Sequence, residues 1–263
     1  MGSATTQATA ATSAALAATP GVDLGTAREL FAAARALGES PQLSGALADA
    51  AASPEARAKV VADIFAPSFA PATVSLLTVA VKQRWSSASD LIDGIEELAI
   101  RAAAAADENA DVEGELFQVS RMVSANPQLE LALGSRLGDA AAKGALVDSL
   151  LSGRASAATT LIAASIVQQP RERRVRQLLS LAMRLVADER GRTVATVYAA
   201  AAPSAEQLTR LATSLGQRYG NTVSLNVVVD PSVVGGLRVE IGDDVIDATV
   251  SARLHDLRQR LAG

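Results

Sequence analysis

The sequence predicts a mainly helical protein, with two related helical bundles in tandem followed by a small α/β domain. Three observations carry this prediction: an alanine-rich composition, an internal repeat, and a change of hydrophobic period near residue 190. A chain of 263 residues favours two or three domains, at about 100–200 residues each. We place a low-complexity tail at 1–22, the two bundles at 23–108 and 109–190, and the α/β domain at 191–263.

The composition favours helices and excludes several classes of chemistry. Hydrophobic residues make up 49% of the chain and aromatic residues only 3%, so small and aliphatic residues provide the apolar content. Alanine loses no side-chain entropy in a helix. The absence of Cys and the single His255 remove most raw material for disulfides, zinc sites and thiolate or Ser-His catalysis. We therefore expect no catalytic residue, no cofactor and no metal.

Charge and hydropathy argue against nucleic acid and against a membrane span. Acidic residues number 28 and basic residues 24, a balance that does not suit a protein built to neutralise phosphates. Residues 1–22 lack the basic leading segment and the continuous apolar stretch of a signal peptide. Pro67 and Pro71 break the uncharged run 64–81, which leaves it short of the roughly 20 residues of a spanning helix. We expect a soluble protein that reaches a membrane only through its partners.

An internal repeat organises the first 190 residues. Glu29-Leu30-Phe31 recurs as Glu115-Leu116-Phe117, an offset of 115 − 29 = 86. The same offset pairs further residues without a gap: Pro41-Gln42-Leu43 with 127–129, Ala72-Thr73 with 158–159, and Gln83 with Gln169. Ser40 pairs with Asn126 and Ser53 with Asp139, exchanges between residues that are all favoured N-caps. A dozen matches at one offset indicate a duplication.

Helical spacing of apolar residues sets the expected elements of each copy. We predict helices near 24–37, 41–51, 54–65, 71–84 and 88–106, and then near 112–123, 127–137, 140–152, 156–168 and 171–188. Bundles made largely of Ala and Leu pack closely, and their grooves accept another amphipathic helix.

The last seventy residues change to a mixed pattern that predicts β-α-β-β-β-α. Residues 192–199 and 223–229 suit strands, and the helix between them begins with the capping-box pair Ser204 and Gln207 and ends at Gly220. A hairpin over 237–246 turns at Gly242-Asp243. A final helix carries an apolar stripe at Val250, Leu254, Leu257 and Leu261. The pattern contains no phosphate-binding loop.

One long motif of this segment reads Asp230-Pro231-Ser232-Val233-Val234-Gly235-Gly236-Leu237-Arg238-Val239-Glu240-Ile241-Gly242-Asp243-Asp244-Val245-Ile246-Asp247. It resembles the C-terminal signature of the delta-subunit family of bacterial F-type ATP synthases, the counterpart of the mitochondrial oligomycin-sensitivity-conferring protein. Members usually have one six-helix bundle, and the tandem bundles resemble the longer actinobacterial form. Two features depart from the family: Ala248-Thr249 replaces the common Gly-Ser, and residues 1–22 lack the charges of an amphipathic helix.

The resemblance implies structural signature residues rather than a catalytic site, namely Asp230, Pro231, Gly235, Gly236, Gly242, Asp243 and Asp247. It implies a non-catalytic peripheral-stalk subunit of the proton-translocating ATP synthase, peripheral on the cytoplasmic face of the cell membrane. The helical bundle would bind alpha subunits of the catalytic head, and the α/β domain and last helix would bind the b-type stalk. We expect the contacts at exposed apolar positions of the first-bundle helices and the terminal helix, with the extra bundle lengthening the stalk or adding contacts.

The most basic run of the chain is Arg171, Arg173, Arg174 and Arg176, with Glu172 inside it. One interpretation is a nucleic-acid patch, and the other is a solvated helix start that touches an acidic partner. The absence of interleaved aromatic residues and the net acidic charge favour the second.

Two other groups resemble binding sites but have simpler explanations. Asp243, Asp244 and Asp247 do not follow the spacing of an EF-hand loop, and a Gly-Asp turn accounts for the first two. Gly235-Gly236 leads into a strand rather than a helix N-terminus, which favours tight backbone packing or a bulge over a phosphate cradle.

Single aromatic residues are also more simply structural. Trp85, the only Trp, is expected to be a buried anchor rather than an interface hot spot. His255 is expected at the surface of the terminal helix. Two alternative functions remain open. One is an enzyme whose site lies between the helical and α/β domains, which requires Asp243, Asp247 and His255 to converge in a pocket. The other is a nucleic-acid-binding module.

Overall fold

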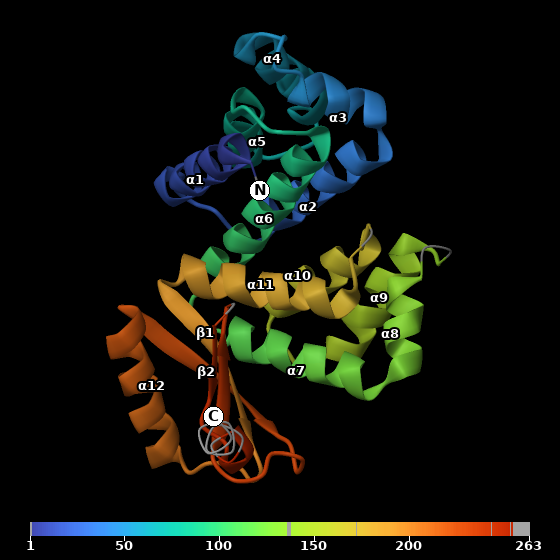
Figure 1. The fold of residues 1–263 in the computed structure, drawn as a ribbon. Coiled ribbons are helices and arrows are strands. Elements are labelled where there is room, and N and C mark those ends of the chain that lie inside the picture. The colour runs from blue at the N-terminus through green and yellow to red at the C-terminus, as the bar shows by residue number, and fades with distance from the viewer. Residues whose placement is uncertain (1, 136–137, 172, 243, 253, 255–263) are drawn as a thin grey trace, which may run out of the picture. The chain divides into compact units, whose positions relative to one another are not determined.

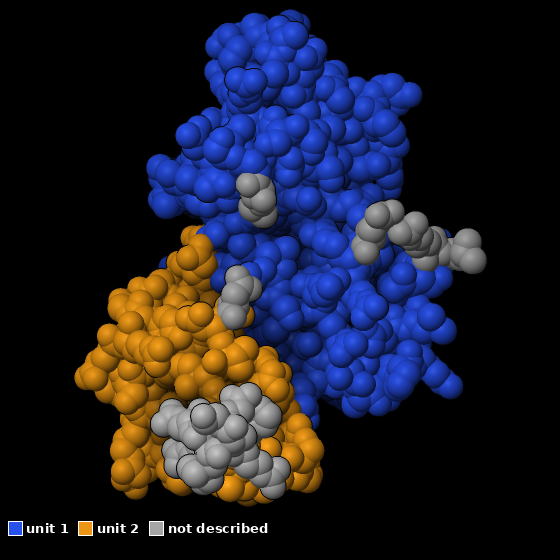
Figure 2. Space-filling model, viewed as in Figure 1, with its two compact units in different colours: residues 1–186 blue, residues 187–263 orange. Residues whose placement is uncertain are grey.

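A computed structural model describes residues 2–135, 138–171, 173–242, 244–252 and 254. The chain folds as two compact units, residues 1–186 and 187–263, which Figure 2 colours separately. Helices make up the first unit, and the second unit contains a small four-stranded sheet (Figure 1). The predicted fold class, mainly helical with a small α/β region at the C-terminal end, is confirmed.

The first unit begins with α1 (Ser3–Ala18), α2 (Leu24–Glu39), α3 (Pro41–Ala48), α4 (Pro54–Phe65), α5 (Pro71–Lys82) and α6 (Ala88–Ala106). Helix α1 occupies the segment for which the sequence analysis predicts only a low-complexity tail. Its buried residues Thr5, Ala8, Thr12 and Leu16 recur every three or four positions, and the helix packs against α5 and α6. Alanine-rich sequence supports this helix without any charged residue.

The second copy comprises α7 (Val112–Ala125), α8 (Pro127–Gly134), α9 (Ala140–Leu151), α10 (Ala157–Gln168) and α11 (Val175–Glu189). Three of its helices begin 86 residues after their counterparts, since 127 − 41, 140 − 54 and 157 − 71 all equal 86. The predicted positions of the helices in both copies are confirmed. The largest difference is the later start of α11, at Val175 rather than near 171, and α3 and α8 end earlier than predicted. The structure therefore carries the duplication that the sequence repeat predicts.

Helix α6 belongs to both copies. At the offset of 86, its first residue Ala88 corresponds to Arg174, next to the start of α11. The first residue of α1, Ser3, corresponds to position 89 in α6. Helix α6 is therefore the counterpart of both α1 and α11. The helix packs against α1, α2, α3 and α5 of the first copy and against α10 of the second. This shared helix explains why the two copies form one compact unit. The domain boundary predicted at 108/109 falls directly after α6 and stays a prediction.

Helix starts show which predicted caps form hydrogen bonds. Ser40 Oγ accepts from Leu43 N at 3.3 Å, Ser53 Oγ from Ala56 N at 3.2 Å, and Asp139 Oδ1 from Ala142 N at 2.9 Å. The prediction for Asn126 is wrong, because its side chain makes no cap and its Nδ2 donates backward to Met122 O at 2.7 Å. Helix α8 still begins at the expected place, where Pro127 needs no N–H partner.

Trp85 anchors the first copy, as predicted. It is 4% exposed, and its Nε1 donates to Ala80 O at 2.8 Å at the end of α5. The indole ring lies against Gly94 of α6, so closely that a Cβ on Gly94 would stand 2.1 Å from a ring carbon. Only glycine fits at this crossing without a shift of the ring.

The second unit contains β1 (Arg192–Ala199), α12 (Ala205–Tyr219), β2 (Thr222–Val229), β3 (Leu237–Ile241) and β4 (Asp244–Asp247). The sheet order is β2-β1-β3-β4, with β1 parallel to β2 and the other pairs antiparallel. Helix α12 packs on one face of the sheet through a core of Ala195, Val197, Leu215, Val223, Val239 and Ile241. The predicted capping box of α12 and the αL stop at Gly220 are both present.

Two predictions for this unit need comment. The strand predicted at 223–229 is present, and it has buried residues on both faces. Val223 is buried and Val229 is 47% exposed on one face, and Asn226 and Val228 are buried on the other. The predicted final helix begins at Val250. Its predicted apolar residues Leu257 and Leu261 lie outside the described residues.

Candidate interaction sites

Each copy contains the same partly buried cluster of hydrogen bonds around one glutamate. Glu29 Oε2 in α2 accepts from Thr73 Oγ1 at 2.6 Å and from Ala70 N at 2.9 Å, at the start of α5. Glu115 Oε2 in α7 accepts from Thr159 Oγ1 at 2.5 Å and from Ser156 N at 2.9 Å, at the start of α10. These are the repeat-matched residues of the sequence analysis. The cluster holds α2 to α5 in the first copy and α7 to α10 in the second, so its role is structural.

The second cluster has one further bond, from Ser156 Oγ to Glu115 at 2.6 Å. Burial raises the pKa of Glu115, but the hydrogen bonds from Ser156 and Thr159 outweigh it, so the pKa of this carboxyl lies below its ordinary value. Hydrogen bonds to the charged form stabilise it. The carboxylate is therefore ionised at neutral pH and serves as an acceptor.

The basic run pairs mainly with carboxylates of its own chain. Arg171 contacts Asp93 and Glu96 of α6, and Arg173 donates to Glu96 at 2.9 Å. Both arginines precede α11, which begins at Val175 rather than near 171. The predicted solvated helix start is therefore wrong for these two residues, because they join the second copy to α6. Their partners Asp93 and Glu96 lie one helical turn apart on α6, but nothing in the sequence around the arginines indicates this pairing.

Glu96 is 8% exposed and depends on these arginines. Burial raises the pKa of Glu96, and the positive charges of Arg171 and Arg173 counteract that rise. A buried carboxylate is costly unless it is paired and hydrogen-bonded. We infer that removing either arginine loosens the junction between the copies.

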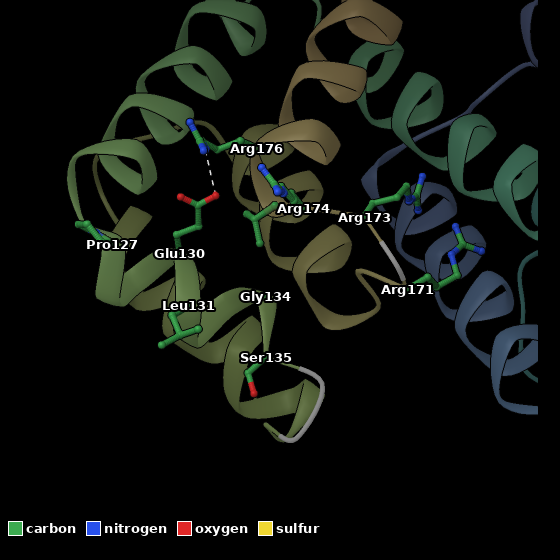
Figure 3. A pocket seen from close by; sticks show the side chains of 10 residues that line it. Pro127, Glu130, Leu131, Gly134, Ser135, Arg171, Arg173, Arg174 and Arg176 are labelled. Carbon is green, nitrogen blue, oxygen red and sulfur yellow. Dashed lines mark hydrogen bonds and ion pairs between the residues drawn. The ribbon is translucent and has the colours of Figure 1, made fainter.

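The other two arginines line a pocket on the second copy. Arg176 Nε donates to Glu130 Oε1 of α8 at 2.9 Å, and Arg174 lies beside it (Figure 3). Figure 3 shows Arg171 and Arg173 on the opposite side, toward the helices of the first copy. The remaining wall comes from α8, where Leu131 is 75% exposed. The sequence analysis named the arginines but not Glu130 or Leu131.

Gly235 and Gly236 form a close backbone crossing in the second unit. Their φ values are 62° and 79°, in the left-handed region that favours glycine. A Cβ on Gly236 would stand 2.3 Å from Ala248 O. Val250 N donates to Gly235 O at 3.2 Å and Ala248 N to Leu237 O at 2.9 Å. The tight backbone packing predicted for the glycine pair is therefore confirmed.

The acidic signature residues shape loops around this crossing. Asp230 Oδ1 accepts from Ser232 N at 2.9 Å in the turn that contains Pro231, and these Ser232 bonds hold the pKa of Asp230 below its ordinary value. Asp247 Oδ1 accepts from Thr249 N at 2.9 Å, which likewise lowers the pKa of Asp247. Thr249 Oγ1 then accepts from Ala252 N at 3.2 Å and begins the final helix. The departure from the family's Gly-Ser therefore keeps a capping hydroxyl.

The β3–β4 hairpin turns as predicted at Gly242, whose φ is 57°, with Ile241 facing Asp244. Asp243 and His255 lie outside the described residues, so the convergence that an enzyme would need with Asp247 is not described. No group of three metal-ligating side chains occurs within the described ranges. The helices in the described part of the chain are also too short or too polar to cross a membrane.

Several large apolar side chains of the second unit are exposed. They are Val229, Val234, Val245, Val250 and Leu254, between 45% and 63% exposed. The first unit exposes Ile64 of α4, Leu131 of α8 and Leu146 of α9 in the same way. Such residues are more often contact sites when they cluster than when they are scattered.

A protein-family model described as the ATP synthase delta (OSCP) subunit matches residues 98–261. The chain belongs to this family. A relative named ATP synthase subunit delta, from Leifsonia xyli subsp. xyli, is 47% identical over 265 residues, with 100% of each chain covered. A relative of the same name from Streptomyces avermitilis is 40% identical and covers 90% of this chain and 88% of its own.

The match of the family model begins inside α6 and includes the second copy and the α/β unit. Residues 1–97 lie before it, although they align with the Leifsonia xyli delta subunit. A chain of the mitochondrial ATP synthase of Toxoplasma gondii is similar over 64% of this chain and 97% of that chain, at 20% identity and a TM-score of 0.38. That likeness is too low to define the fold further.

Proposed function

We propose that this chain is a non-catalytic peripheral-stalk subunit of an F-type ATP synthase, which ties the catalytic head to the membrane sector against rotor torque. The observation that carries the proposal is membership of the delta (OSCP) family, with a full-length relative at 47% identity. The chemistry agrees, because the signature residues that the structure describes form turns and backbone crossings rather than a reaction centre.

The two units suit different partners. The second copy lies within the family match, which supports assigning attachment to alpha subunits of the head to this copy rather than to the first. The α/β unit exposes a group of valines near its hairpin and final helix, which supports a contact with the b-type stalk subunit. Apolar side chains at the centre of a contact supply most of its affinity.

A stalk must transmit force without yielding, and the helical unit is built accordingly. Helix α6 packs on both copies, and Arg171 and Arg173 fix the second copy to it through Asp93 and Glu96. Shared helices and partly buried ion pairs oppose rotation of one copy against the other. The first copy then acts as a rigid extension that lengthens the stalk or adds contacts.

In this arrangement the chain lies on the cytoplasmic face of the membrane and is held there through its partners. The test is a mild-detergent purification of the tagged chain from membranes, with mass spectrometry of what accompanies it. Alpha, beta and b-type subunits in constant proportion support the proposal. Recovery without them, or with nucleic acid or a small metabolite, refutes it and favours the enzyme or nucleic-acid alternative.

A matched pair of variants tests the assignment of partners. Val245→Asp places a charge on the exposed valine group of the second unit, whereas Ile64→Asp does the same at a 45% exposed position of α4. We expect Val245→Asp to lose the b-type subunit and to keep alpha, and Ile64→Asp to keep both. Equal loss from both variants would contradict the division between the units.

A further inference from the structure

A pocket of about 530 Å³ opens on the second copy between α8 and the start of α11. Its walls are Pro127, Glu130, Leu131, Gly134 and Ser135 on one side and residues 171 and 173–176 on the other (Figure 3). Val175 also lines the pocket and is buried, whereas Leu131 of α8 is 75% exposed. The pocket therefore offers apolar surface beside positive charge.

Positive charge exceeds negative charge among the described residues that line this pocket. Four arginines and one glutamate of the described chain belong to its walls. Arg171 and Arg173 are neutralised by α6, and Arg176 pairs with Glu130, where both side chains remain partly exposed at 47% and 27%. Arg174 is exposed and forms no ion pair with any residue that the structure describes. An exposed pair such as Arg176–Glu130 is worth about 0–1 kcal/mol, so an incoming carboxylate can replace Glu130.

The first copy provides an internal comparison, because the same fold occurs there without these residues. At the offset of 86, Leu131 corresponds to Gly45, Arg174 to Ala88 and Arg176 to Asp90. In the first copy Ser87 caps α6 by accepting from Asp90 N at 3.1 Å, with no arginine involved. The first copy therefore folds without an arginine at positions 88 and 90 and without a leucine at position 45, although the exposed Arg84 lines a pocket at the same crossing. The fold of a copy does not require Arg174, Arg176 or Leu131.

We propose that this pocket is a docking site for an acidic segment of another protein, one that places an apolar side chain against Leu131 and Val175 and a carboxylate on Arg174 and Arg176. Arginine suits this role because its planar guanidinium binds a carboxylate through two parallel hydrogen bonds. The inference goes beyond the proposed function and does not require it, since it defines a site by chemistry rather than by membership of a complex.

A protein segment fits this surface better than a nucleic acid does. Nucleic-acid surfaces combine extended positive charge with aromatic side chains, and the pocket has no aromatic residue among its walls. Two of its four arginines are already neutralised by α6. Arg174, which has no ion-pair partner among the described residues, and the exposed Leu131 together match a short peptide with one or two carboxylates.

Photo-cross-linking in cells that make the full chain tests this inference. A benzoylphenylalanine placed at Leu131 or, in a second chain, at Pro127 on the same wall reports on whatever occupies the pocket. The same group at Gly45, an open position of α3, is the control from the first copy. We expect mapped cross-links from positions 131 and 127 to a protein segment with Asp or Glu within about one helical turn, and none to that segment from position 45.

Charge variants then separate this docking site from a passive contact. Arg174→Glu should lower the cross-link yield at position 131 by about tenfold, and Arg174→Lys should keep most of it, because like charges across an interface repel. Thermal unfolding of both variants checks that the bundle is intact. Cross-links to nucleic acid, an absence of cross-links from both wall positions, or a yield indifferent to Arg174→Glu would each overturn the inference. Co-purification of ATP synthase subunits is scored separately and decides only the proposed function.

Discussion

Gly94→Ala is the sharpest test of how the first copy is packed. The ideal Cβ of residue 94 would stand 2.1, 2.5 and 3.1 Å from three carbons of the Trp85 ring. Carbon atoms in contact prefer a separation of about 3.5–4.0 Å, so the Trp85 ring or α6 has to move by about 1 Å or more. Trp85 is 4% exposed and tied to Ala80 O, which leaves it little room.

The magnitude follows from two opposing effects. Overpacking of a core costs about 1–3 kcal/mol, and the severity of this overlap favours the upper end. Replacing a helical glycine by alanine returns about 1 kcal/mol of helix propensity. We therefore expect Gly94→Ala to lower the free energy of unfolding by about 2 kcal/mol. Gly45→Ala in α3, where nothing lies within 4 Å, isolates the propensity effect and should raise it by about 0.5–1 kcal/mol.

Urea unfolding followed by fluorescence measures both variants, because Trp85 is the only tryptophan and reports on this contact directly. Gly94→Ala should also shift the native emission to the red as the ring moves toward water. Trp85→Phe combined with Gly94→Ala, followed by circular dichroism, should recover most of the loss because the smaller ring leaves space. If Gly94→Ala proves as stable as the parent with unchanged emission, the reasoning about this crossing is wrong.

Three further predictions address the other structural features. Glu115→Gln should lower the free energy of unfolding by about 1 kcal/mol at neutral pH. This loss should shrink as the pH falls below 4.5, because a lowered pKa in the folded chain contributes stability only while the carboxyl group is ionised. Chemical unfolding at several pH values measures it, and a pH-independent difference would contradict the reasoning. Gly236→Ala should destabilise the second unit by about 2 kcal/mol in hydrogen exchange, since it strains a φ of 79° and meets Ala248 O, and unchanged protection of β3 would refute it. Ser204→Ala should cost about 1 kcal/mol through loss of the α12 cap, and full retention of the melting temperature would count against that cap.

Local signals predicted the fold well. Hydrophobic period, proline at the first helical position and capping residues are set within a few residues of chain, which explains the agreement at α4, α6 and β1. The failures have equally local causes. Asn126 makes no cap because its amide bonds back to Met122 O, and α1 was missed because a helix without charges or an apolar stripe has weak periodicity.

Contacts between distant parts of the chain were not predictable in the same way. The pairing of Arg171 with Asp93 and Glu96 spans 78 and 75 residues. Nothing near Arg171 in the sequence indicates that α6 will meet it. The repeat offset does align α6 with both α1 and α11, but the sharing of one helix by two copies emerges only from packing. The walls of the pocket were predictable only in part for this reason. The arginines form a basic run in the sequence, whereas the exposure of Leu131 is evident only in the folded structure.

The two copies show which features the fold requires and which are free to serve partners. The carboxylate cluster is present in both, where Glu29 accepts from Thr73 and Glu115 accepts from Thr159. It holds α2 to α5 in the first copy and α7 to α10 in the second. The surface at α8 and α11 keeps Pro127, the counterpart of Pro41, but has leucine and arginines in place of Gly45, Ala88 and Asp90. Divergence at exposed positions alone is unremarkable. Here the divergence puts an exposed leucine beside Arg174, which forms no ion pair with a described residue, and neither side chain adds to the core, so a partner that covers both explains it best.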